Sequence, residues 1–62
     1  MDSAALIRRL KAEGWKQAHV NGSHHKFKHP AKQGHVVVPH PKRDLPTGTV
    51  RGIYRQAGWD WK

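Results

Sequence analysis

Histidine and lysine side chains are crowded into residues 20–30, whose sequence is VNGSHHKFKHP. His24, His25 and His29 lie there together with Lys26 and Lys28, directly after an Asn-Gly pair. Imidazole can bind a metal ion or exchange a proton near neutral pH, and ammonium groups contact phosphates. The run therefore raises three possibilities: a metal site, a phosphate-binding surface, or a catalytic histidine in a basic setting.

A metal site fits the spacing of these histidines poorly. His25 and His29 are four residues apart, so on a strand they project from one side but lie about 13 Å from each other, too far to share an ion. His35 and His40 follow, but the chain has no cysteine, and no well-placed carboxylate completes a ligand set. We therefore expect no metal and no other cofactor.

The charge balance favours a nucleic-acid partner. Twelve Lys and Arg against four Asp and Glu give a formal net charge of +8 in 62 residues. Self-repulsion of that size is a cost that an anionic ligand offsets, and a basic domain is typical of nucleic-acid binding. An anionic membrane fits less well because no stretch pairs a basic face with a broad apolar one. An acidic protein partner is compatible with the same charge.

The elements that position these side chains are expected in the order helix, three strands, helix. Residues 2–15 predict a helix with an apolar stripe of Leu6, Ile7 and Leu10, an N-cap at Asp2 or Ser3, and a stop at Gly14. Strands are predicted over residues 15–20, 23–29 and 35–39, a connector over 40–46, and a second helix over 47–58 that ends at Gly58. Trp59, which follows, is expected to fold back onto the core.

Short connections between these elements predict a single α+β domain over residues 1–62. The fold is an antiparallel three-stranded meander with both helices on one face and the other face open to solvent. The N-terminus carries no apolar stretch long enough for a signal peptide or a membrane span, so a cytoplasmic location is the default expectation.

A two-residue Asn21-Gly22 loop would fix which histidines face solvent. It pairs His19 with His24 and Gln17 with Lys26, and strand alternation then gives two faces. The helix side receives Ala18, Val20, His25 and Phe27, and the open side receives Gln17, His19, His24, Lys26 and Lys28. A three-residue loop would reverse this assignment.

His24 is then an exposed imidazole beside ammonium groups. Those neighbours disfavour its charged form, so we expect His24 to be neutral at pH 7 and able to accept a proton. RNA carries its own nucleophile in the 2′-hydroxyl, so one base, one cation and one acid suffice to cleave it. His25 also reads simply as a partly buried, hydrogen-bonded histidine, and the acid is not identified, with His19 across the hairpin as a candidate.

Two stretches resemble the HicA (YcfA-type) family of small bacterial toxins. They are GSHHKFKHP and VVVPHPKRDLPTGTVRGIYRQAG, and the likeness runs from the first helix through Gly58. The resemblance implies a double-stranded-RNA-binding-like fold and an mRNA interferase with one essential histidine. That histidine corresponds to His24, with His25 as second choice because some members shift it by one place. A HicB-type antitoxin that covers His24 with an acidic surface is the implied partner.

Contacts to mRNA are expected from residues of the hairpin and of the connector. These are Gly22, Ser23, Lys26, Lys28, Lys42 and Arg43. The alternative to a nuclease is an RNA-binding module that uses the same cations and blocks translation without cutting.

Overall fold

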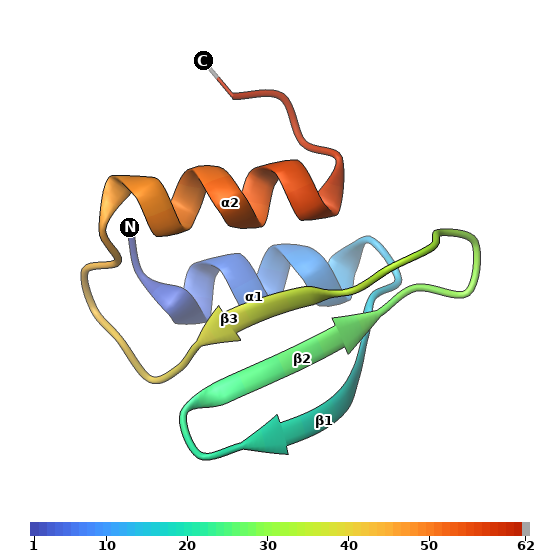
Figure 1. Ribbon diagram of the computed structural model, residues 1–62, viewed down its shortest axis with the longest axis horizontal. Helices are drawn as coiled ribbons and strands as arrows, with labels where there is room; N and C mark the ends of the chain where they lie inside the picture. Colours follow the sequence, from blue (N-terminus) through green and yellow to red (C-terminus); the bar gives the residue numbers. More distant parts are fainter. Residues whose placement is uncertain (62) are drawn as a thin grey trace.

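Two helices and one antiparallel sheet make up the computed structural model, which describes residues 1–61 (Figure 1). The order is α1 (Ser3–Ala12), β1 (Lys16–Asn21), β2 (His24–Lys28), β3 (Val36–Pro39) and α2 (Thr47–Ala57), with the strands arranged β1-β2-β3. This confirms the predicted α+β architecture. No helix in residues 1–61 is long and apolar enough to cross a membrane.

Local sequence signals place both helices as predicted. Asp2 is the N-cap of α1, where its carboxylate accepts a hydrogen bond from the Ala4 amide at 2.8 Å. Helix α2 ends at Gly58, whose φ of 77° is a left-handed conformation that a residue with a Cβ adopts only at a cost. Ser3, the other candidate N-cap, is instead the second partner of a buried hydrogen bond described below.

The core lies between the helices and two of the three strands. Phe27 of β2 and Val36 and Val38 of β3 are fully buried, as alternation along a strand requires for one covered face. Burying each such side chain contributes about 1.5–3 kcal/mol. The remaining core members come from both helices and the flanking loops: Leu6, Leu10, Trp15, Leu45, Val50, Ile53, Ala57 and Trp59.

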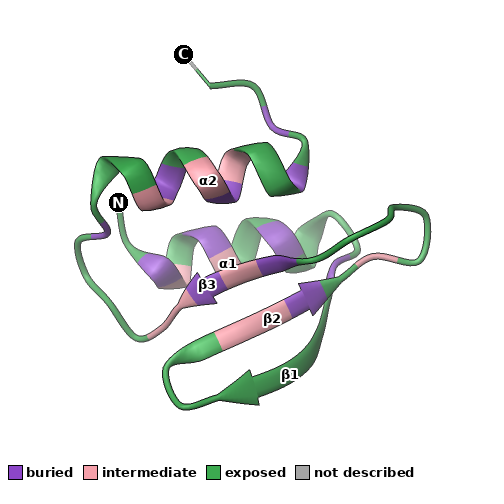
Figure 2. Ribbon diagram, viewed as in Figure 1, coloured by how far each residue is buried: buried purple, intermediate pink, exposed green. Residues whose placement is uncertain are grey.

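Strand β1 lies outside this core. All six of its residues are exposed, and the helices pack mainly against β3 (Figure 2). The prediction that Ala18 and Val20 meet the helices is therefore wrong, and Val20 is 45% exposed. The strand order β1-β2-β3 makes both β1 and β3 edge strands, and the helices pack over β3, so β1 at the far edge is left uncovered.

The hairpin turn lies one residue later than predicted. The loop is Gly22-Ser23, with Asn21 opposite His24 and His19 opposite Lys26. Gly22 takes a φ of 61° and Ser23 is not in the left-handed region, the combination that a type II′ turn uses. A bulge between Gln17 and His19 then sets Gln17 opposite Phe27, so Gln17 does not share the open face as predicted.

A buried hydroxyl joins α1 to the connector after β3. The Ser3 side chain is fully buried and its Oγ lies 2.7 Å from Nδ1 of His40. The same Oγ accepts a hydrogen bond from the Lys42 amide at 2.9 Å, and the Lys42 carbonyl accepts one from the Ser3 amide. The His40 ring and the Lys42 amide therefore share one buried hydroxyl, which ties the start of α1 to the connector.

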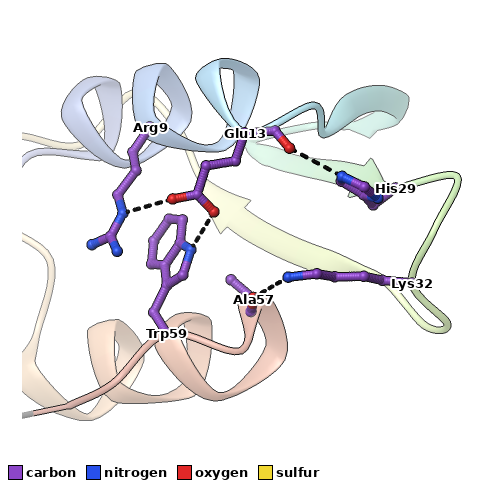
Figure 3. A network of polar contacts seen from close by, with 6 residues as sticks. All are labelled: Arg9, Glu13, His29, Lys32, Ala57 and Trp59. Carbon is purple, nitrogen blue, oxygen red and sulfur yellow. Dashed lines mark hydrogen bonds and ion pairs between the residues drawn. The ribbon is translucent and has the colours of Figure 1, made fainter.

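Polar contacts hold the segment after α2 against α1 (Figure 3). Indole Nε1 of Trp59 donates to Glu13 at 2.8 Å, and Nε of Arg9 donates to the other carboxylate oxygen at 3.2 Å. The Trp59 bond, opposed by partial burial and reinforced by Arg9, holds the pKa of Glu13 below its ordinary value. His29 donates to the Glu13 carbonyl, so this histidine has a structural role.

Candidate active site

A shallow hollow opens on the sheet face that the helices leave uncovered. It has a volume of about 490 Å³ and is lined by His19, Asn21, His24, Lys26 and Val37. All three strands contribute to it. Strand β1 forms one wall with His19 and Asn21, β2 forms the centre with His24 and Lys26, and β3 forms the other wall with Val37. The hollow therefore crosses the sheet at right angles to its strands.

Strand register fixes the distances across this hollow. His19 lies directly opposite Lys26, where Cβ atoms are about 5 Å apart, and His24 lies diagonal to His19, at about 7–8 Å. On the β3 side, Lys26 faces Val37 and His24 faces Pro39, both apolar. The two imidazoles thus flank one ammonium group, and the third strand adds an apolar wall.

The electrostatic character of the hollow is cationic. None of its five lining residues is a carboxylate, and Lys26 is half-buried between exposed His19 and His24. An ammonium group with part of its stem covered has fewer rotamers to lose when it contacts an anion. The site can therefore attract a phosphate and offers two imidazoles, the side chain most often used for proton transfer in catalysis.

His25 is on the other side of the sheet from His24. It is half-buried, and its ring meets that of His40 edge to face, with centroids 5.0 Å apart. Since His40 is tied to Ser3, the His25 ring packs against a fixed neighbour rather than against an open surface. The partial burial predicted for His25 is confirmed, the hydrogen bond predicted for its ring is not among the contacts of residues 1–61, and the ring lies apart from the hollow.

The other residues predicted to bind RNA lie at the rim or further away. Gly22 and Ser23 form the turn beside His24, and the Ser23 carbonyl accepts a hydrogen bond from the His40 amide at 2.7 Å. Lys28 is exposed opposite Lys16, one pair beyond the hollow. The exposed Lys42 and Arg43 belong to the connector, and neither lines the hollow.

Two lining residues, Asn21 and Val37, were not singled out in the sequence. Asn21 was assigned to the turn, where its side chain would have had no fixed face. Val37 belongs to an apolar run, VVV, in which only strand alternation distinguishes the middle residue from its buried neighbours. That alternation was the available signal. Within residues 1–61, no three His, Asp or Glu side chains are grouped closely enough to hold a metal ion.

Fold and hollow together define a class: a small, strongly basic α+β protein with histidines on an open sheet face. Comparison with family models gives the particular family, because the model described as HicA toxin of bacterial toxin-antitoxin systems matches residues 3–59 of the 62. The chain belongs to this family. It is therefore a toxin of a toxin–antitoxin system and has an antitoxin as partner. No curated protein matches the chain.

Proposed function

We propose that this toxin is an endoribonuclease, an mRNA interferase that cleaves RNA with His24 and so inhibits translation. No metal ion takes part in the proposed chemistry. The observation that carries the proposal is the shared hollow: His24, His19 and Lys26 line one open space on the uncovered sheet face, with room for a phosphate and the nucleotides beside it. A HicB-type antitoxin is the partner that the family resemblance implies.

His24 acts as the general base in this proposal. Its neutral imidazole takes the proton of an RNA 2′-hydroxyl, and the 2′-oxygen attacks the adjacent phosphorus. The bond from phosphorus to the 5′-oxygen of the next nucleotide then breaks. The upstream product ends in a 2′,3′-cyclic phosphate and the downstream product begins with a 5′-hydroxyl. General acid–base assistance of this kind is worth about 10²–10⁴ in rate.

Lys26 stabilises the negative charge that develops on the phosphate oxygens. It sits between the two imidazoles, directly opposite His19 and next but one to His24 on β2. Preorganised cations aimed at developing charge are among the largest contributors to catalysis. Lys28, one step further along the same side of β2, contacts a neighbouring phosphate of the chain.

His19 is the general acid that protonates the departing 5′-oxygen. Among the residues that line the hollow, it is the one besides His24 that exchanges a proton near neutral pH. Its diagonal position, about 7–8 Å from His24 between Cβ atoms, leaves room for a phosphate between the rings. Attacking and leaving oxygens lie on opposite sides of phosphorus, so an acid and a base on opposite sides fit the reaction.

A non-catalytic RNA-binding module is the second candidate. The exposure of Lys28, Lys42 and Arg43 outside the hollow favours it, because cations spread over a surface serve binding equally well. Such a protein would block translation by occupying mRNA.

Replacing His24 by Ala in purified protein and incubating it with bare RNA in chelator tests the proposal. We expect wild-type cleavage to give cyclic phosphate ends and His24→Ala cleavage to be lower by about 10²–10⁴, with RNA affinity and thermal stability unchanged. His35→Ala, which removes an exposed histidine outside the hollow, is the matched control. Products with plain 3′-hydroxyl ends, or full activity of His24→Ala, would overturn the assignment.

A further inference from the structure

An arginine–aromatic patch lies on the helix layer, formed by Arg9, Arg51, Tyr54, Trp59 and Trp61; we call it the helix patch. Tyr54 is at its centre, with the rings of Trp59 and Trp61 each 5.2 Å away and nearly perpendicular to it. Guanidinium groups sit at both ends, Arg9 at 3.9 Å from the Trp59 ring and Arg51 at 5.7 Å from the Trp61 ring. The rings and cations thus form one ordered series.

The two tryptophans of the helix patch differ in what they do for the fold. Trp59 is 9% exposed and donates its indole N–H to Glu13, so the core and the network of Figure 3 account for it. Trp61 is 43% exposed, a large apolar side chain at the surface of a chain with a mean hydropathy of −0.90. It adds little to the core, yet Tyr54 and Arg51 hold its ring in place.

Two arginines of α2 make no ion pair within residues 1–61. Arg51 lies beside Trp61, Arg55 lies one helical turn further along α2, and both are exposed. The ion pairs of the described residues join Met1 to Asp44 and Arg9 to Glu13. An apolar ring with such a guanidinium group beside it suits a ligand that offers a carboxylate next to an apolar side chain.

We propose that the helix patch is a docking surface for the antitoxin, which places an acidic side chain on Arg51, an apolar one on Trp61, and a further acidic one on Arg55, the arginine one helical turn beyond the patch on α2. The proposal rests on membership in a toxin–antitoxin family, not on the nuclease assignment. It adds a contact on the helix layer to any cover over His24 on the opposite sheet face.

The chemistry of the cations decides between a protein and RNA as the occupant. Trp, Tyr and Arg are the residues most enriched at the centres of protein interfaces, whereas Lys is depleted there. The helix patch contains no lysine, while the open sheet face carries Lys16, Lys26 and Lys28 and no arginine. The two faces therefore differ in the way that a protein-binding and a phosphate-binding surface differ.

Tryptophan fluorescence tests this directly, because Trp15 and Trp59 are buried and Trp61 is exposed. In the free toxin, acrylamide should quench mainly the emission of Trp61, so wild type should be quenched more than Trp61→Phe. We expect saturating cognate antitoxin to abolish this difference in quenching, and a ten-nucleotide RNA to leave it unchanged. Continued quenching in the antitoxin complex, or protection by the RNA, would overturn the proposal.

Affinity measurements supply the energetic half of the test. We expect Trp61→Ala and Arg51→Ala each to weaken antitoxin binding at least tenfold, whereas Lys11→Ala, an exposed cation of α1 outside the helix patch, changes it less than twofold. RNA cleavage by all three variants should equal that of wild type, which separates this proposal from the nuclease assignment. Equal antitoxin affinity of wild type and Trp61→Ala would refute it.

Discussion

The open sheet face and the helix patch carry the same sign of charge but differ in how that charge is held. On the sheet face, Lys26 and the two histidines of the hollow make no hydrogen bond or ion pair among the contacts of residues 1–61. In the helix patch, Arg9 stacks on Trp59 and pairs with Glu13. The sheet face leaves the polar groups of its hollow free for a ligand, whereas the helix patch holds Arg9 in contacts within the fold and leaves Arg51 without an ion pair in residues 1–61.

This difference follows from the two kinds of cation. A guanidinium is planar and stacks on aromatic rings while it pairs with a carboxylate, whereas an ammonium is a compact, strongly hydrated charge on a flexible stem. Arginines of the helix layer can therefore stabilise the fold and remain at the surface. Lysines of the sheet face contribute little to the fold, so their replacement should weaken ligand binding and leave the stability of the protein unchanged.

After His24→Ala, the largest effect is expected from His19→Ala, which tests the sheet face as a catalytic surface. Cleavage of ordinary RNA should fall about 100-fold, since a general acid contributes about that much. On a substrate whose 5′-bridging oxygen is replaced by sulfur, the leaving thiolate needs no proton, so wild type and variant should cleave at nearly equal rates. An equal loss on both substrates would show that His19 does not donate the proton.

A smaller effect is expected from changing the β1–β2 turn that positions His24, compared with the same change in the loop between β2 and β3. Gly22 has a φ of 61° and Gly34, in the loop between β2 and β3, has a φ of 80°, and neither would bring a Cβ within 4 Å of another residue. Gly22→Ala and Gly34→Ala should each lower the free energy of unfolding in urea by about 1–2 kcal/mol. RNA cleavage should fall in Gly22→Ala alone. Unchanged stability of Gly22→Ala would show that the turn is not of the assigned type.

The smallest effect is a pH dependence of stability that originates in the helix layer. Because the bond from Trp59 lowers the pKa of Glu13 in the folded state, its stabilisation is present above about pH 4.3, the ordinary glutamate value, and is lost as the pH falls through the lower folded-state value. Glu13→Gln and Trp59→Phe should flatten the urea-midpoint curve between pH 5 and pH 3. A curve identical to wild type would exclude Glu13 as its source.

Local signals were sufficient to predict the helices, the strands and the side of the sheet on which His19, His24 and Lys26 lie. The turn was placed one residue too early, because both Asn21-Gly22 and Gly22-Ser23 are favourable two-residue loops. Moving such a loop by one residue shifts the pairing by two, and since side chains alternate with a period of two, the shift by itself moves no residue to the other side. His24 and Lys26 therefore face solvent in either register. Gln17 changes side because of the bulge.

What the sequence did not reveal depends on contacts between distant segments. The bulge at Ala18 is an irregularity of an edge strand, and no turn residue or charge marks it. The bond between Ser3 and His40 joins residues 37 positions apart, so only the assembled fold brings them together. Exposure of β1 likewise reflects how far two helices reach across a sheet, which hydrophobic alternation within the strand does not encode.

Strand β1 supplies one wall of the hollow while no helix lies over it. Its attachment to the molecule is the ladder with β2, interrupted by the bulge. Fluctuations that separate β1 from β2 would leave the apolar interior intact. The amides that bond between β1 and β2 should therefore exchange with solvent far sooner than those that bond between β2 and β3. The width of the hollow that a polynucleotide would enter thus depends on a strand that can move without the domain unfolding.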